Sequence, residues 1–251
     1  MLKNIKKGLK NMQISNKVKM IGISGIARSG KDTFVGIAKE ILSKNGYVPV
    51  RVAFADKLKE EVSAMLKSSG FGLDLTNLSP EEKERIRPLF VFWGCQRRQE
   101  STEGLYWVDV AEQEINNIMI NYMATHGADP DKLVFLVSDV RFLNEANWIQ
   151  SKFGGEVIHL KRFQIEQRKG GQDYSDLIPT KVYDSAPNEE ELKNDPLVVS
   201  VSNHKIEWES KKKMTSAEAI KDPYLQQVVL DTLNKTKYFK HPSPITGILH
   251  Q

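Results

Sequence analysis

The 251-residue chain lacks several features that would assign a class at once. Its single cysteine, Cys95, excludes a disulfide within the chain and predicts a reducing compartment, the cytoplasm. No apolar run approaches the roughly 18–20 residues that cross a bilayer, so we expect no membrane partner. The five histidines lack the spacing of metal ligands, and no nucleophile–histidine arrangement is legible.

The net charge of the chain is also small. The 36 Lys and Arg residues exceed the 32 Asp and Glu residues by only +4, which suits small anionic ligands but is too weak to indicate specific nucleic-acid binding. Acidic residues are absent from the first 31 positions, where lysines recur. We expect residues 1–17 to form a flexible basic leader, because a transit peptide would be richer in Arg and Ser.

What the chain does contain is an alternation of short apolar runs and helical patterns. This alternation is typical of parallel strands with helices on both faces of their sheet. We therefore predict a three-layer α/β/α fold around a parallel five-stranded sheet. The expected strands are 18–24, 48–54, 133–137, 157–160 and 197–201.

Helices are expected between those strands. Apolar residues at helical spacing predict helices over 34–42 and 106–123, and a third that ends at Phe153. Asp56 is expected to cap a fourth helix.

A fifth helix has an explicit start signal. Ser79 supplies a cap, Pro80 suits the first turn, and Glu82 stands at the capping-box position. Pro88 is expected to break or kink this helix, because proline removes an internal hydrogen bond.

The last third of the chain is less regular. Residues 163–196 are polar and lack periodicity over more than thirty positions, which predicts a lid or a disordered segment. One more helix is expected over 215–233. We therefore divide the chain into the leader, a main domain over 18–204 and a C-terminal helical extension over 205–251.

One motif carries clear chemistry. The segment Gly25-Ile26-Ala27-Arg28-Ser29-Gly30-Lys31 matches the phosphate-loop pattern G-x-x-x-x-G-K, between an expected strand and an expected helix. In such a loop the glycines let backbone N–H groups point at phosphate oxygens, and the lysine reaches the β- and γ-phosphates. The alternative is a glycine-rich turn that binds nothing.

The next two positions depart from that pattern. Asp32 stands where Ser or Thr is expected, and Thr33 follows it. Adenylate-kinase-like nucleotide kinases commonly place the hydroxyl one position later, so Thr33 is the candidate to contact phosphate or Mg²⁺. Asp32 is a candidate helix cap or ligand of a metal-bound water.

A second candidate group follows the apolar run 133–137. Asp139 would lie at the carboxyl end of a buried strand, where phosphate-loop proteins keep the carboxylate that holds Mg²⁺ through water. Arg141 follows, and its planar fork suits a phosphate. The alternative is that Asp139 caps the next helix.

Other arginines stand in segments expected over the same sheet edge. They are Arg97, Arg98, Arg162 and Arg168. A phosphoryl-transfer site needs several cations, although each arginine alone can equally be a surface residue. Arg162 is the best candidate, because it would close the fourth strand.

Several segments together resemble the phage-type deoxynucleoside monophosphate kinases. The matching segments are 23–33, 53–59, 105–108, 138–141 and 155–160. The resemblance runs from about residue 19 to 203. It implies an adenylate-kinase-like P-loop kinase that moves a phosphoryl group from ATP to a deoxynucleoside monophosphate with Mg²⁺, in the host cytoplasm if the protein is viral.

The same resemblance assigns further residues. Asp56 and Lys57 would border the acceptor pocket, together with Trp107. Arg97 or Arg98 would contact the acceptor monophosphate. Gly25 to Thr33 would hold the ATP phosphates, Asp139 and Arg141 would serve the metal and phosphate, and Arg162 would begin the lid.

Alternatives stay open at this point. Animal-type phosphomevalonate kinase shares the Gly-Lys-Asp loop and the Asp-Val-Arg segment, and dephospho-coenzyme A kinase is a third possible enzyme. A non-catalytic nucleotide-binding module is the alternative outside enzymes. The accepted bases and sugars are open, as is the oligomeric state, for which a homodimer is one alternative.

Overall fold

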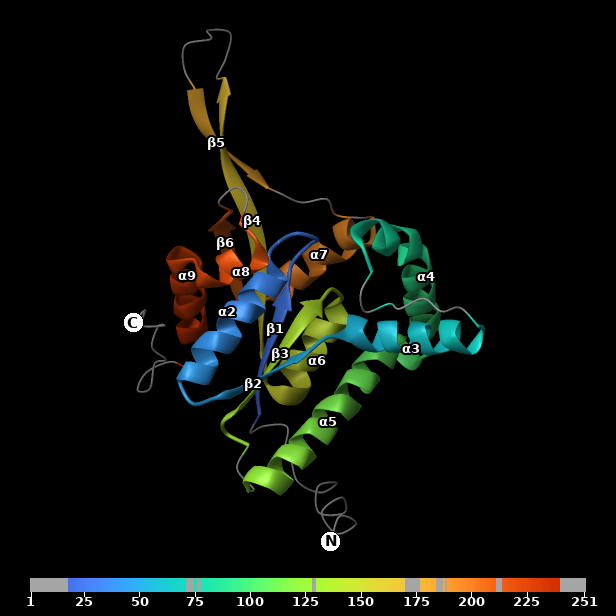
Figure 1. Cartoon of the computed structure of the whole chain (residues 1–251). Coiled ribbons are helices and arrows are strands. Elements are labelled where there is room, and N and C mark those ends of the chain that lie inside the picture. The colour runs from blue at the N-terminus through green and yellow to red at the C-terminus, as the bar shows by residue number, and fades with distance from the viewer. Residues whose placement is uncertain are drawn as a thin grey trace. The chain divides into compact units, whose positions relative to one another are not determined.

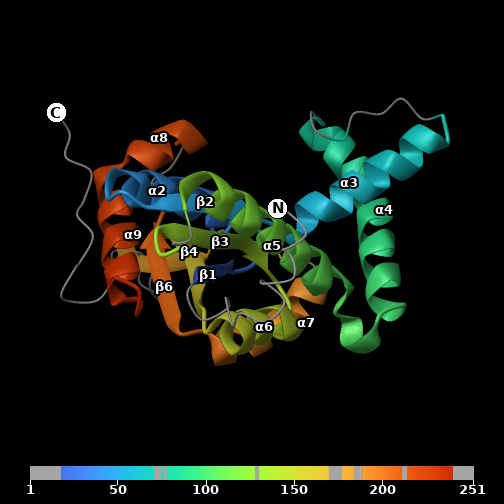
Figure 2. The same ribbon diagram turned by 90° about the horizontal axis from the view of Figure 1, so that it is seen from below.

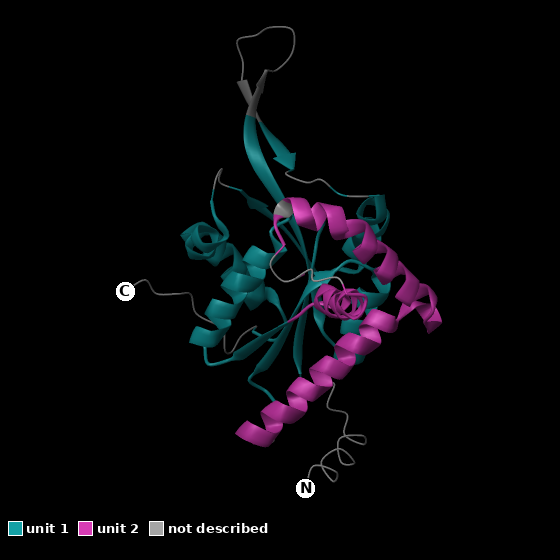
Figure 3. Cartoon of the chain, turned by 45° about the vertical axis from the view of Figure 1, so that its right-hand side comes forward, with its two compact units in different colours: residues 1–51, 130–251 teal, residues 52–129 magenta. Residues whose placement is uncertain are grey.

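The computed structural model describes residues 18–70, 75, 78–127, 130–169, 177–183, 187, 189–210 and 214–239. The chain divides into two compact units, Met1–Arg51 with Pro130–Gln251 (unit 1) and Val52–Asp129 (unit 2) (Figure 3). The predicted leader, 1–17, lies outside the described residues.

The described part of the chain contains one six-stranded mixed sheet in the order β2-β3-β1-β4-β5, with β6 beside β4. The strands are β1 (Lys19–Ser24), β2 (Val48–Val52), β3 (Leu133–Val140), β4 (Glu156–Lys169), β5 (Leu177–Tyr183) and β6 (His204–Glu209). β1 pairs in parallel with β3 and β4, and β6 is parallel to β4, but β5 is antiparallel to β4. The predicted α/β class is confirmed, whereas the purely parallel five-stranded sheet is wrong.

Helices cover both faces of this sheet (Figure 2). On one face lie α2 (Lys31–Lys44), α8 (Ser216–Lys221) and α9 (Pro223–Lys235), and on the other α6 (Leu143–Phe153) and α7 (Glu189–Val201). Ile41 of α2 and Val229 of α9 are buried in one apolar cluster with Ile23 of β1. On the opposite face, Gly22 leaves room for Ile149 of α6, whose Cδ1 would lie 2.6 Å from a Cβ at that position.

Unit 2 is helical. It consists of α3 (Phe54–Ser68), α4 (Pro80–Gln99), the short 3-10 helix η2 (Thr102–Gly104) and α5 (Tyr106–His126). The Ser79 hydroxyl accepts from the Glu82 backbone N–H at 3.2 Å and the Glu82 carboxylate from the Ser79 N–H at 2.8 Å, which confirms the capping box. The described residues include no helix with the length and apolar character to cross a bilayer.

Two expectations about these helices are corrected. α4 continues beyond Pro88 to Gln99, so of the two expected effects of this proline the break is wrong, and the kink stays a prediction. α3 begins at Phe54 after Ala53, so Asp56 lies within its first turn and is not its cap. A carboxylate in the first turn still favours the helix through the positive end of the helix dipole.

The segment expected as a lid is largely regular where it is described. β4 runs on past the residues predicted for it to Lys169 and pairs with β5 (Figure 1). The run 197–201 belongs to α7 and is not a strand, because it continues a helix whose first turn is acidic. A strand parallel to β4 is found instead after Asn203, where β6 begins.

The C-terminal region also differs from the expected single helix. Asp222 separates α8 from α9, and its carboxylate accepts from the Leu225 N–H at 3.0 Å. Pro223 occupies the first turn of α9. Backbone N–H groups there have no partner within the helix, so the N–H that proline lacks is not missed. The region 205–251 therefore contributes β6 to the sheet and α9 to the core of unit 1.

Trp208 of β6 ties this region to the turn between β1 and α2. It is 1% exposed, and its indole Nε1–H donates to the Ser29 carbonyl oxygen at 2.9 Å. Its ring lies 6.2 Å from that of Phe34 between centroids. A Cβ at Gly30 would lie 2.4 Å from the same ring, so the indole packs directly on the turn.

We predict that Trp208→Ala lowers the free energy of unfolding by about 3–5 kcal/mol, the cost typical of deleting a buried aromatic side chain. Trp208→Phe keeps an aromatic ring and should cost about 1–2 kcal/mol for the lost hydrogen bond. Urea denaturation measures both.

Leu197→Ala is the control, because Leu197 is 46% exposed in the same unit and its truncation should be nearly neutral. Equal, small effects at both positions would contradict the packing described for Trp208.

Candidate functional site

The turn between β1 and α2 has a backbone that requires glycine. Gly25 has φ +135° and Gly30 has φ +89°, a region that side chains disfavour. A Cβ at Gly25 would lie 2.4 Å from the Leu160 carbonyl oxygen. Arg28 also has a positive φ, at +65°, and its side chain is exposed. The motif glycines therefore serve a tight loop against β4.

Lys31 opens α2 and folds back over this loop. Its ammonium Nζ donates to the Gly25 carbonyl oxygen at 2.5 Å and to the Ile26 carbonyl oxygen at 2.8 Å. Burial lowers the pKa of Lys31 from its ordinary value, and the positive charge of Arg141 lowers it further. Loop, helix N-terminus and two cations make this edge of the sheet suited to an anion.

Asp139 lies at the same edge as the loop. β1 and β3 are parallel, and their register pairs Ser24, which precedes Gly25, with Val140, which follows Asp139. The negative charges of Glu191, Asp32 and Asp139 each act to raise the pKa of Lys31. These three carboxylates are therefore near enough to stabilise the charged form of the Lys31 side chain.

Asp139 does not cap α6. That helix begins at Leu143, and the Glu145 carboxylate accepts from the Arg141 N–H at 2.8 Å and the Phe142 N–H at 3.1 Å. The capping alternative for Asp139 is therefore wrong, and Glu145 performs that task.

Arg141 is held by a residue that sequence reasoning missed. Its Nη1 lies 3.4 Å from the Oε1 of Glu191, which α7 brings to the loop, and the Glu191 side chain is only 9% exposed. Glu191 lies in the polar segment where no periodicity was legible. Its only sequence signal is the acidic run at the start of α7.

Asp32 and Thr33 stand in the first turn of α2. Gly30 is the N-cap of this helix, so Asp32 is not its cap. The described residues contain no cluster of three or more His, Cys, Asp or Glu side chains fit to hold a metal ion. Mg²⁺ in phosphate sites commonly uses one or two carboxylates with phosphate oxygens and waters, so Asp139 and the Thr33 hydroxyl stay the predicted protein donors of such a smaller set.

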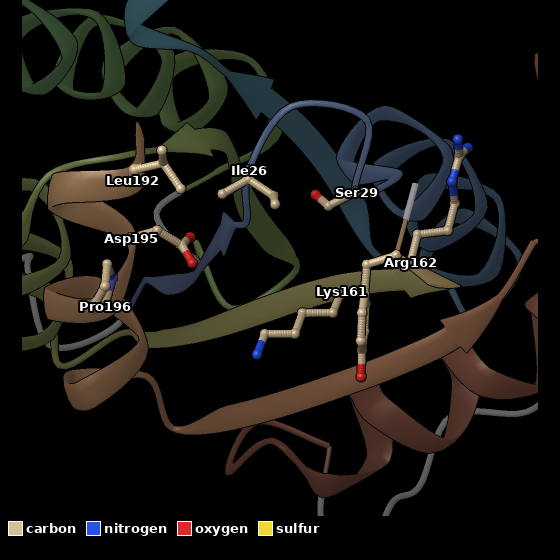
Figure 4. Close-up of a pocket in the computed structure, with 8 residues that line it drawn as sticks. Ile26, Ser29, Lys161, Arg162, Leu192, Asp195 and Pro196 are labelled. Atoms are coloured by element: carbon tan, nitrogen blue, oxygen red, sulfur yellow. The ribbon is translucent and has the colours of Figure 1, made fainter. Parts of the chain in front are cut away.

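A cavity of about 310 Å³ adjoins the loop (Figure 4). Its lining residues are Ile26, Ser29, Lys161, Arg162, Tyr183, Leu192, Asp195 and Pro196. Arg162 thus lines the cavity from within β4. The expectation that Arg162 closes this strand is wrong, because the strand continues to Lys169.

The other residues assigned by resemblance belong to unit 2. Lys57 of α3 lies 2.9 Å from Glu60 and 3.5 Å from Glu114, measured between Nζ and carboxylate oxygens. Asp56 lies 3.8 Å from Lys59. Trp107 is buried, and its indole N–H donates to the Gly94 carbonyl oxygen at 3.1 Å, so it supports the packing of α5 against α4.

Arg97 is the centre of a polar cluster in unit 2. Its Nε donates to the Glu61 carboxylate at 3.0 Å, and its guanidinium lies 4.9 Å from the Trp93 ring centroid and 5.0 Å from that of Tyr106. Glu61 also accepts from the Trp93 indole N–H at 2.8 Å and from the Tyr106 hydroxyl. Arg98 follows Arg97 on α4 and is half-buried. The cluster fixes the orientation of Arg97.

Comparison with known proteins adds no relative: none of the protein-family models matches the chain, and neither does any curated protein.

We predict that Glu191→Gln tightens the binding of inorganic tripolyphosphate several-fold. The carboxylate beside Lys31 and Arg141 repels an incoming anion, and the amide removes that repulsion without changing the side-chain shape. Isothermal titration calorimetry measures the dissociation constant. Glu189→Gln, an exposed change in the same helical turn, should leave it unaltered. Weaker binding by Glu191→Gln would show that Glu191 orients Arg141 for the anion instead.

A second prediction concerns Glu61. Burial alone would raise its pKa, but hydrogen bonds from Tyr106, Trp93 and Arg97 outweigh burial and hold the pKa below the ordinary 4.5. The stability that this depressed pKa contributes is present above 4.5 and is lost as the pH falls through the folded-state pKa. Glu61→Gln should therefore destabilise the protein at neutral pH and approach the wild type in acid.

Urea denaturation at neutral pH and well below pH 4.5 measures this convergence. Glu84→Gln, whose carboxylate forms an exposed pair with Arg87, should have little effect at either pH. A Glu61→Gln deficit that is constant with pH would contradict the ionised hydrogen-bond network.

Proposed function

We propose that the chain is an adenylate-kinase-like P-loop kinase that transfers the γ-phosphoryl group of ATP to a deoxynucleoside monophosphate. The observation that carries this proposal is the glycine-dependent loop with Lys31 folded over it, at the edge where β3 brings Asp139. A metabolic kinase needs this combination of backbone donors, a mobile cation and a nearby carboxylate.

Each group has a task in this proposal. The loop N–H groups hold the β-phosphate, and the Lys31 ammonium exchanges its two carbonyl partners for phosphate oxygens. Arg141 leaves Glu191 to neutralise charge on the transferring group. Asp139 and Thr33 would hold Mg²⁺, which offsets charge on the phosphates when bound.

The acceptor site is assigned by the resemblance. Asp56, Lys57 and Trp107 would border the acceptor, and the orientation of Arg97 fixed by Glu61 supports this arginine as the contact to its phosphate. The β4–β5 ribbon and α7 would act as the lid that limits ATP hydrolysis by water.

The proposal predicts ADP release only when an acceptor is present. A coupled ADP-release assay with ATP, Mg²⁺ and each deoxynucleoside monophosphate in turn should show turnover with at least one of them. Lys31→Ala should lower kcat at least about a hundredfold, as loss of a transition-state donor does. Arg141→Ala should slow turnover or raise the acceptor KM.

Lys39→Ala is the matched control, because Lys39 is an exposed lysine on α2. The assay also includes ribonucleotides, phosphomevalonate and dephospho-coenzyme A. Turnover with phosphomevalonate or dephospho-coenzyme A alone would overturn the acceptor class. ATP binding without any turnover would favour a non-catalytic module, and full activity of Lys31→Ala would contradict the site itself.

A further inference from the structure

The cavity beside the loop is formed by four parts of unit 1, namely the loop, β4, α7 and the end of β5 at Tyr183 (Figure 4). Ile26 and Ser29 come from the loop, β4 supplies one wall, and α7 supplies the opposite wall. Ile26 also gives its carbonyl oxygen to Lys31. The cavity and the proposed phosphate site therefore share a wall, and a group attached to a phosphate in the loop can enter the cavity.

Size and lining suit one flat heterocycle. A volume of about 310 Å³ is at the lower end of small-molecule sites. Ile26, Leu192 and Pro196 are apolar, so the lining offers surfaces against which a flat ring can pack.

Ser29 supplies a polar group that a ligand can satisfy. Ser29 is 2% exposed, and its hydroxyl oxygen has no hydrogen-bond partner in the described part of the chain. Buried hydroxyls are normally hydrogen-bonded, so a sugar or phosphate oxygen in the cavity would complete this one.

Asp195 supplies a carboxylate that can accept a hydrogen bond from the heterocycle. Its Oδ1 lies 2.9 Å from Nε2 of His159, a residue only 1% exposed, and the carboxylate points from α7 toward the cavity (Figure 4). A carboxylate only accepts, so His159 donates and fixes the orientation of Asp195. The other carboxylate oxygen, Oδ2, then selects a ligand that offers an N–H donor.

We propose that the cavity receives the base of the nucleotide held by the loop, and that Asp195 accepts a hydrogen bond from the exocyclic amino group of that base. This rests on the proposed function and adds to it the basis for choosing the phosphate donor. For ATP the group is the amino group of adenine.

The test compares ATP with purine riboside triphosphate, which differs only by lacking that amino group, and with inorganic tripolyphosphate, which has no base. Wild-type protein should bind ATP at least about tenfold more tightly than the analogue, as expected for a hydrogen bond to a charged group. Asp195→Asn keeps an oxygen for His159 but presents an NH₂ group, so the preference for ATP should vanish or invert. Tripolyphosphate binding should not weaken, because the substitution removes a negative charge near the anion and no group that binds it.

Two further variants make the result decisive. Asp231→Asn repeats the same chemical change at an exposed site on α9 and should keep the wild-type preference. Leu192→Trp fills the cavity from a position that is 61% exposed, where folding is not at risk, and should weaken ATP binding but not tripolyphosphate binding.

Equal binding of ATP and the analogue by the wild type would overturn the role of Asp195. Unchanged ATP binding by Leu192→Trp would overturn the cavity as the base site. Either result leaves the phosphate loop standing if tripolyphosphate binds. A wild type that binds neither ATP nor tripolyphosphate would contradict the proposed function as well.

Discussion

The hydrogen bond from the Trp208 indole to the Ser29 carbonyl oxygen is the constraint on which the candidate site depends. The loop contains two glycines at positive φ, and glycine alone gives a flexible turn. The buried indole against Gly30 removes that freedom, and the Leu160 carbonyl beside Gly25 confines the other end. A loop held in this way keeps its backbone donors oriented before any ligand binds, which is what preorganised binding requires.

α7 connects the loop to the ribbon formed by β4 and β5. Glu191 and Asp195 stand one helical turn apart, so they share a face of this helix. Glu191 holds Arg141 by a 3.4 Å ion pair, while Asp195 lines the cavity next to the loop. An anion that replaces Glu191 as the partner of Arg141 would therefore release Glu191. This residue is on α7, the helix that also carries Asp195, the residue that we propose contacts the base. Phosphate and base recognition would then be coupled through one rigid element.

The sequence predicted what is encoded locally. The glycine turn after β1, the capping box at Ser79 and the end of α6 at Phe153 each depend on residues within one or two turns of chain, and each is present. The run 197–201 misled because a short apolar stretch fits a strand or a helix equally well, and the preceding acidic turn decided for the helix.

What could not be predicted depends on pairing over long distances in the chain. Trp208 meets Ser29 across 179 positions, and Glu191 meets Arg141 only because α7 packs beside α6. The antiparallel partner of β4 lies in a polar segment that lacks a hydrophobic alternation. No local pattern encodes such contacts, whereas Asp139 was found because its buried strand led directly to the sheet edge.

The central claim is that the backbone N–H groups of residues 25–33 bind phosphate. Two-dimensional ¹⁵N NMR of the full chain, titrated with inorganic tripolyphosphate, tests it most directly. The account predicts saturable shifts centred on the amides of Gly25 to Thr33, with smaller changes at Arg141 and Glu191. Shifts spread over exposed lysines, with the loop amides unmoved, would contradict it.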